Sequence, residues 1–170
     1  QVVGVRSNPG ALGTIINNLV ALGVGQIYPV ALIGDDGEGY ELGQALKQMP
    51  GVYLDGLVTA TTARTPTYTK PMLHRLDQIP VELNRLDIKN RRPTLRAIED
   101  QLIERFNDWW DLVDAWIVLD QVSEENCGVI TERVREFIAE KAARDPLKFV
   151  LADSRERISQ FRSVSVKPNA

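Results

Sequence analysis

The chain has 170 residues, of which 44% are hydrophobic and 25% are charged, and these proportions are ordinary for one globular domain. The net charge is −3, and the basic residues are spread along the chain rather than gathered in one stretch, which argues against nucleic acid as a partner. No apolar run is long enough to cross a membrane and no signal segment opens the chain, so the sequence predicts a cytoplasmic protein without a membrane partner.

The first half of the chain alternates between predicted helices and strands. Residues 10–23 form the first predicted helix, because apolar residues repeat at helical spacing and Gly23 ends the pattern. Residues 27–33 are apolar without polar alternation, which is typical of a strand buried on both faces of a parallel sheet. After a Gly-Asp-Asp-Gly turn, residues 42–49 predict a second helix that ends at Pro50.

The pattern changes between residues 65 and 88, where no helical stripe is present. Thr, Tyr, Val and Leu residues interrupted by Pro66, Pro71 and Pro80 predict antiparallel strands with free edges. We expect these strands to form a small flap, or lid, beside the main sheet. The prediction also assigns residues 1–8 to this flap.

Helix and strand signals alternate again in the second half. Residues 95–106 predict a helix, residues 115–119 a buried strand, and Ser123 the start of a long helix. Two further strands are predicted at 149–152 and 164–166. Repeated strand–helix–strand units predict an α/β fold in a single domain over residues 1–170, with a doubly wound, mainly parallel sheet and the small antiparallel flap.

Polar residues directly after predicted strands are the first candidates for a binding site, since ligands bind at the carboxyl ends of the strands in such sheets. These residues are Asp36, Asp120, Asp153 and Asn169. The alternative is structural, because Asp is also common in turns and at helix starts. One Cys and one His, at 127 and 74, provide no Cys/His zinc spacing, so no metal site is predicted.

Two ordered motifs give the chain a family resemblance. Residues 10–23 contain a glycine turn that opens a helix ending in Leu-Gly, and residues 30–39 contain a strand followed by a Gly-x-Asp-x-x-Gly turn. In this order and at this spacing they resemble the signatures of the PfkB, or ribokinase-like, carbohydrate kinases. Residues 64–70 and 84–87 are similar to the lid strands of the heptose-phosphate kinase branch of that family, and the resemblance continues through 149–153 to 167–169.

The resemblance implies a function and a set of site residues. It implies ATP-dependent phosphorylation of a sugar or sugar-phosphate hydroxyl, with ATP and Mg²⁺ as cofactors. Gly10 and Thr14 would contact the substrate through the turn, Lys70 would reach an anionic substrate group from the lid, and Asp120 would accept a hydroxyl. Asn169 would lie near the phosphates and the magnesium ion.

Departures from the family pattern bear on substrate and activity. Ala11 and Thr14 stand where the family has a second Gly and a sugar-contacting Asn, and a Thr hydroxyl cannot present a separate amide donor and carbonyl acceptor. The family's catalytic Gly-Ala-Gly-Asp segment has no counterpart, so no catalytic residue is assigned and the base is expected beyond Ala170. We therefore expect a chain that is truncated at both ends relative to a longer kinase.

Other expectations concern partners and rival functions. The flap has open edges and little core, which predicts a homodimer formed through it. Lys70 could instead serve as an exposed charge that protects an edge strand from aggregation. One rival function is a non-catalytic ribokinase-fold protein that binds a ligand or regulates a partner. Another is a generic Rossmann-like nucleotide binder, although no Gly-x-Gly-x-x-Gly motif follows a strand.

Overall fold

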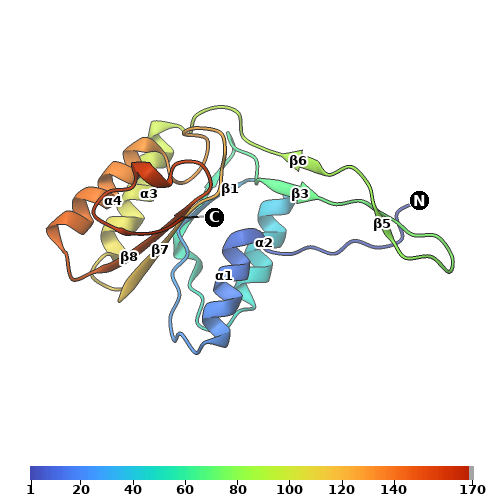
Figure 1. The fold of residues 1–170 in the computed structure, drawn as a ribbon, viewed down its shortest axis with the longest axis horizontal. Coiled ribbons are helices and arrows are strands. Elements are labelled where there is room, and N and C mark those ends of the chain that lie inside the picture. Colours follow the sequence, from blue (N-terminus) through green and yellow to red (C-terminus); the bar gives the residue numbers. More distant parts are fainter. Residues whose placement is uncertain (169–170) are drawn as a thin grey trace.

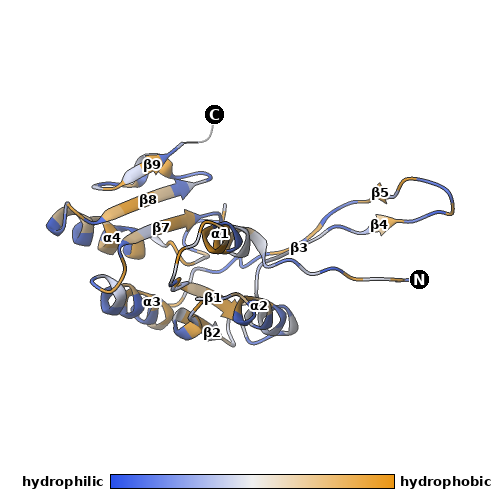
Figure 2. Cartoon of the chain, turned by 90° about the horizontal axis from the view of Figure 1, so that it is seen from below, coloured by the Kyte–Doolittle hydropathy of each residue, from blue (hydrophilic) through white to orange (hydrophobic). Residues whose placement is uncertain are grey.

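The structure is a computed structural model that describes residues 1–168 (Figure 1). Helices and parallel strands make up a body from which a long antiparallel arm projects, and the N-terminal residues run out in the same direction as this arm (Figures 1 and 2). Among residues 1–168, no helix combines the length and the apolar character needed to cross a membrane.

The body contains two short parallel sheets, and the chain is therefore a mixed α/β protein, as expected. The first sheet pairs β1 (Ala31–Gly34) with β2 (Leu57–Ala60). The second has the order β7 (Ala115–Asp120), β8 (Phe149–Ser154), β9 (Ser165–Lys167). Within the described part of the chain no ladder joins β1 to β7, so the expected single doubly wound sheet is present only as these two parallel pieces.

The first sheet differs from its prediction in length and in partner. The strand predicted at 27–33 is regular only from Ala31, because Pro29 interrupts it, and Ile27 makes an isolated parallel bridge to Val52 instead. Its partner β2 was not predicted, although Leu-Val-Thr-Ala is a reasonable strand sequence. A short 3₁₀ turn, η1 (Leu54–Gly56), leads directly into β2.

Four helices accompany the strands: α1 (Gly10–Ala21), α2 (Gly37–Lys47), α3 (Arg96–Trp109) and α4 (Glu132–Arg144). Two match the predicted segments closely, and α2 begins at Gly37 rather than at residue 42. The prediction that α4 begins at Ser123 was wrong. Asn126 has a left-handed backbone with φ of 57°, and Thr131 is the residue whose hydroxyl accepts the Val134 amide, at 3.3 Å, to cap the helix.

Two hydrophobic clusters hold the body together. The larger one joins side chains of β2, α3, β7, α4 and β8, and the smaller one joins α1 and α2 around Ile16, Ile27 and Leu46. Burial alternates along β7 and β8, so one face of this sheet packs on α3 and α4. The opposite face leaves Ile117 and Phe149 40% and 53% exposed, so the strand predicted as buried at 115–119 is buried on one face only.

The flap at 65–88 is antiparallel, as predicted. β3 (Thr67–Thr69) pairs with β6 (Leu86–Ile88), and further out β4 (Met72–Leu73) pairs with β5 (Val81–Glu82). Residues 1–8 add no strand to it in this structure. They are exposed and make no ladder with β3 or β6; the Ser7 hydroxyl instead donates to the Glu41 carboxylate of α2 at 2.7 Å.

Candidate functional site at the flap base

The residues where the flap joins the body, Arg64, Thr65, Lys89 and Asn90, will be called the flap base. Arg64 and Asn90 lie on its two strands and are joined by two hydrogen bonds: the Arg64 amide donates to Asn90 Oδ1 at 2.9 Å, and Asn90 Nδ2 donates to the Arg64 carbonyl at 2.8 Å. The Asn90 side chain thus replaces one rung of a β ladder. This fixes the separation of the two strands where they leave the body.

Asp36 connects the flap base to α2. It caps this helix by accepting the Gly39 amide at 2.8 Å, and it also accepts the Thr65 amide at 2.9 Å and the Thr65 hydroxyl at 2.7 Å. The Thr65 hydroxyl in turn accepts the Gly34 amide at 2.9 Å. One carboxylate therefore ties together the end of β1, the start of α2 and the first strand of the flap.

Two glycines make this connection possible because side chains would not fit. A Cβ on Gly34 would lie 2.8 Å from the Thr65 amide nitrogen, and one on Gly39 would lie 2.9 Å from the Thr65 hydroxyl. Both separations are closer than non-bonded atoms tolerate. The glycines of the Gly-x-Asp-x-x-Gly turn thus serve the packing of Asp36 and Thr65.

The Asp36 carboxylate is charged and strongly held. Burial raises its pKa, but hydrogen bonds from the Thr65 amide and hydroxyl and from the Gly39 amide, together with nearby Arg64, outweigh burial and bring the pKa below its ordinary value. Its side chain is only 7% exposed, and Arg64 Nε lies 3.3 Å from Oδ2. The lowered pKa means that the connection is strongest with Asp36 ionised.

The second strand of the flap base is tied to the end of β7. Lys89 Nζ donates to Glu124 Oε1 at 3.1 Å, in the loop that follows β7. The hydrogen bond from Lys89 lowers the pKa of Glu124. The flap base therefore touches the segments that follow β1, β2 and β7, which places it at the carboxyl ends of these parallel strands.

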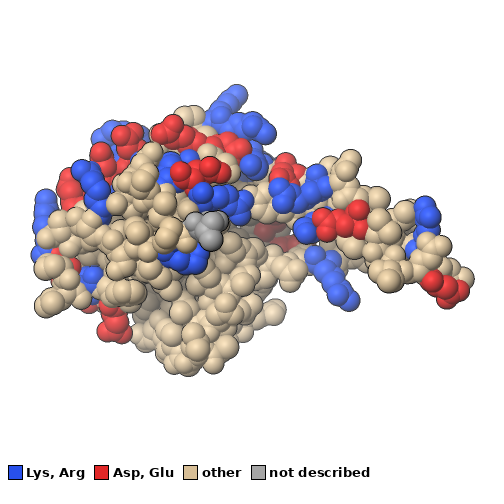
Figure 3. All heavy atoms as spheres, viewed as in Figure 1, with Lys and Arg blue, Asp and Glu red and all other residues tan. Residues whose placement is uncertain are grey.

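The predicted substrate residues Gly10 and Thr14 lie in the exposed first turn of α1. Gly10 has φ of 62°, a conformation that glycine adopts readily, and the Thr14 hydroxyl donates to the Gly10 carbonyl at 2.9 Å. Helix α1 has no charged residue, and Figure 3 shows that the lower part of this face, where Figure 1 places α1, carries no charge. Contacts here would come from amides and a hydroxyl.

Lys70 and Asp120 have partners within the chain. Lys70 Nζ lies 3.2 Å from Glu82 Oε2 across the flap, and both side chains are about half exposed. Asp120 is 3% exposed; Oδ2 accepts the Ser154 hydroxyl at 2.7 Å and Oδ1 accepts Arg157 Nη2 at 3.1 Å. Arg157 also donates to the Val122 and Ser123 carbonyls. The structure thus gives Asp120 protein partners where a sugar hydroxyl was expected.

The remaining candidate residues lie at the ends of β8 and β9. Asp153 Oδ2 accepts Lys167 Nζ at 3.1 Å, and Asp153 Oδ1 is buried without a partner among residues 1–168. Asn169 lies outside the described residues. In the described range no group of three or more His, Cys, Asp or Glu side chains could hold a metal ion, so these residues do not fit a magnesium site.

The described residues do not bring the predicted substrate contacts into one hydrogen-bonded group. Among residues 1–168, no hydrogen bond links Gly10 or Thr14 to Lys70 or Asp120. Sequence reasoning missed Thr65, Asn90 and Arg157, which organise the flap base and the end of β7. Of these three residues, only Arg157 could have been found from the sequence. It follows a strand that ends in Asp-Ser, and a basic residue at such a position is a natural partner for a carboxylate at the end of a neighbouring strand.

Two curated proteins resemble this chain, and both are named bifunctional protein HldE. The chain is 24% identical to the one from Gluconobacter oxydans (strain 621H) over 167 residues, which is 98% of this chain and 33% of that protein. It is 26% identical to the one from Helicobacter hepaticus (strain ATCC 51449 / 3B1) over 156 residues, which is 90% of this chain and 30% of that protein.

The chain therefore spans about a third of the length of the curated relatives it matches. No family model matches it. Identities of 24% and 26% support a relationship to a sugar-kinase-like family at a coarse level, and they do not single out the PfkB family.

Proposed function

We propose that the complete protein phosphorylates a hydroxyl of a sugar or sugar phosphate with ATP, and that this chain supplies the sugar side of the site. One observation supports this most: the flap base follows β2 in the chain and is hydrogen-bonded to the segments that follow β1 and β7. Ligands of α/β sheets bind at such strand ends. The weak similarity to the two HldE proteins extends over nearly the whole chain and points the same way.

The substrate roles follow from exposure and chemistry. The first turn of α1 offers amides and the Thr14 hydroxyl to sugar oxygens. Lys70 is 58% exposed, and an exposed ion pair such as Lys70–Glu82 contributes little, so its ammonium can exchange Glu82 for an anionic substrate group. Asp120 keeps the loop after β7 in place through Arg157, and acts on the substrate through that loop.

The reaction requires groups beyond those described. A base takes the proton of the sugar hydroxyl, the oxygen attacks the γ-phosphorus of ATP, and the bond to the bridging oxygen of ADP breaks. We assign the base and the contacts to ATP and Mg²⁺ to other parts of the complete protein, with Asn169 near the phosphates. Magnesium would supply charge stabilisation there.

An ADP-release assay of the complete protein against a panel of sugars and sugar phosphates tests the proposal. Release that depends on one acceptor is expected, and Thr14→Ala should raise the KM for that acceptor while Thr14→Ser restores it. The pair isolates the hydroxyl from the methyl group. Absence of acceptor-dependent release across the panel would contradict the kinase proposal.

A second candidate is a protein of the same fold that binds a ligand or regulates a partner without phosphoryl transfer. The engagement of both Asp120 oxygens by Ser154 and Arg157 favours it, since no free carboxylate is left at the end of β7. Calorimetry separates the two candidates: sugar binding without ADP release supports this one.

We also propose that the complete protein is a homodimer formed through the flap. The flap has no core of its own and exposes large apolar side chains, among them Leu76 at 91% and Ile79 at 87% in the turn between β4 and β5. In Figure 2 this arm stands clear of the body, so its edges are available to a second copy.

A further inference from the structure

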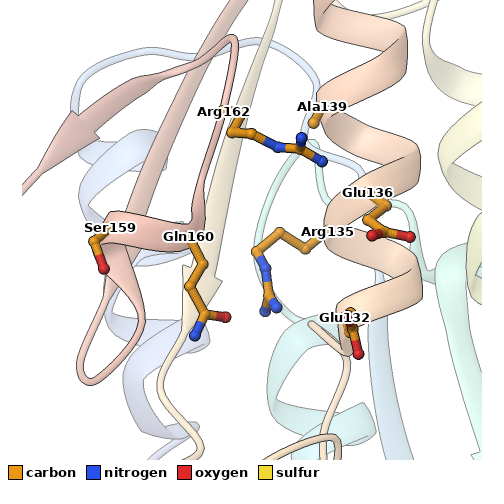
Figure 4. Close-up of a pocket in the computed structure, with 7 residues that line it drawn as sticks. All are labelled: Glu132, Arg135, Glu136, Ala139, Ser159, Gln160 and Arg162. Carbon is orange, nitrogen blue, oxygen red and sulfur yellow. The ribbon is translucent and has the colours of Figure 1, made fainter.

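A cavity of about 310 Å³ lies between α4 and the 3₁₀ turn η2 (Ile158–Gln160), away from the flap base. Figure 4 shows the side chains that line it, which are those of Glu132, Arg135, Glu136, Ala139, Ser159, Gln160 and Arg162. Most of these side chains can form hydrogen bonds or carry a charge. The proposed kinase chemistry uses none of them.

Arg135 is the residue that makes the cavity unusual. It is only 8% exposed, yet among residues 1–168 its guanidinium has neither a hydrogen bond nor an ion pair. Its guanidinium instead lies over the Phe161 ring, whose centroid is 5.9 Å from Cζ. Its five N–H donors have no acceptor among the described residues, so they are available to a ligand in the cavity.

Arg157 provides the comparison within the same chain. It is 9% exposed, nearly as buried as Arg135, and its guanidinium donates to Asp120 and to two backbone carbonyls. The fold therefore gives one buried arginine three acceptors and leaves the other facing a cavity. Figure 4 shows the Arg135 side chain reaching from α4 toward Gln160 on the opposite wall.

Other donors face the same space. Arg162 lies on the segment between η2 and β9, and among the described residues it has no carboxylate partner. Gln160 adds an amide and Ser159 a hydroxyl. Two guanidinium groups and an amide that line one cavity suit a tetrahedral oxyanion, which accepts several charge-assisted hydrogen bonds at once.

Two carboxylates also line the cavity, and they limit its positive charge. Glu132 lies in the first turn of α4, where a negative charge interacts favourably with the helix dipole, and Figure 4 shows the Glu136 carboxylate pointing away from Gln160. Neither forms an ion pair with Arg135. An anion bound to Arg135 would therefore be repelled by Glu132, and this gives the two residues opposite effects on binding.

We propose that this cavity binds a phosphate group anchored by Arg135, with Arg162 and Gln160 as further donors. The cavity is larger than a bare phosphate needs, given that a water molecule takes about 30 Å³ in the liquid. Phosphate can come from the free ion or from a small phosphate monoester, and both present the same oxyanion to Arg135.

Calorimetric titration of the full chain with inorganic phosphate, at neutral pH and matched ionic strength, tests the proposal. Arg135→Gln should raise the Kd for phosphate about tenfold or more, because it removes the charged donor at the centre of the site. Glu132→Gln should lower the Kd. Arg144→Gln, at an exposed position at the end of the same helix, is the matched control and should leave the Kd unchanged.

A parallel titration with glycerol phosphate separates the two sources. Tighter binding than inorganic phosphate assigns the cavity to a phosphate ester, and equal binding assigns it to the free ion. Thermal unfolding guards against a folding defect: without phosphate, Arg135→Gln should melt no lower than the parent, and only the parent should melt higher when phosphate is added. Phosphate affinity that is absent, or equal in the parent and Arg135→Gln, would overturn the proposal.

Discussion

Replacing Asp36 by Ala should loosen the whole flap base. The substitution removes the cap of α2, worth about 1 kcal/mol, and leaves the Thr65 amide and hydroxyl without their acceptor, worth about 1–3 kcal/mol more for a buried donor. We expect a loss of about 3 kcal/mol in the free energy of unfolding. Urea denaturation followed by far-ultraviolet circular dichroism measures it.

The neighbouring Asp35 offers a matched control, because its side chain is exposed and forms no hydrogen bond within the described residues. Asp35→Ala should change the stability by less than about 0.5 kcal/mol. A double-mutant cycle of Asp36→Ala with Thr65→Val should show a coupling of at least about 1 kcal/mol, since the two side chains share a hydrogen bond. Equal losses for the two Asp variants, or an additive cycle, would refute the account of the flap base.

The pH dependence gives an independent check. The pKa of Asp36 is lower in the folded state than in the unfolded chain, so its contribution is fully present above the unfolded value of about 4 and is lost as the pH falls through the folded value. The stability difference between the parent and Asp36→Ala should therefore shrink on acidification. A difference that grows as the pH falls would show that the sign is wrong.

Three further predictions concern the end of β7, the flap base and the flap. Asp120→Ala should destabilise the fold by about 3–5 kcal/mol in urea denaturation, because it leaves Arg157 buried and unpaired. Adding Arg157→Met should recover part of this loss. Equal losses in the single and double variants would contradict the prediction. Asn90→Ala should speed trypsin cleavage within the flap, as two hydrogen bonds between its strands are lost, and an unchanged rate would count against the bridging role. Leu76→Glu with Ile79→Glu should convert the proposed dimer to a monomer in sedimentation velocity, whereas Leu147→Glu, at an exposed position of the body, should not. If the unmodified protein is monomeric at high concentration, the dimer proposal is wrong.

The sequence predicted well those elements whose signals are local. The helical spacing around Ile16 and Leu102 and the uninterrupted apolar residues of β7 and β8 gave the correct type of element and nearly the correct bounds. Prolines correctly marked the flap as antiparallel. The start of α4 was misplaced because Ser123 and Thr131 are both good caps, and the local sequence does not say which of them the tertiary structure uses.

The hydrogen-bond partners of polar side chains could not be predicted from the sequence, because these bonds join segments that are far apart along the chain. Asp36 was singled out by its position after a strand, but its acceptor role toward Thr65 spans 29 residues and depends on how the flap meets α2. Asp120 was expected to face a substrate, and only the fold shows that Arg157, 37 residues later, reaches it. Strand pairing also joins distant segments, so the sequence did not predict the two separate parallel sheets or the absence of a strand in residues 1–8.

Direct observation of the product tests the proposed kinase function most sharply. Phosphorus NMR of the complete protein incubated with ATP, magnesium and an acceptor should show a new phosphate monoester signal that grows with ADP for one sugar or sugar phosphate. Thr14→Ala should slow its appearance at low acceptor concentration. If ATP remains unchanged, or yields only ADP and inorganic phosphate with every acceptor, the chain does not belong to a sugar kinase.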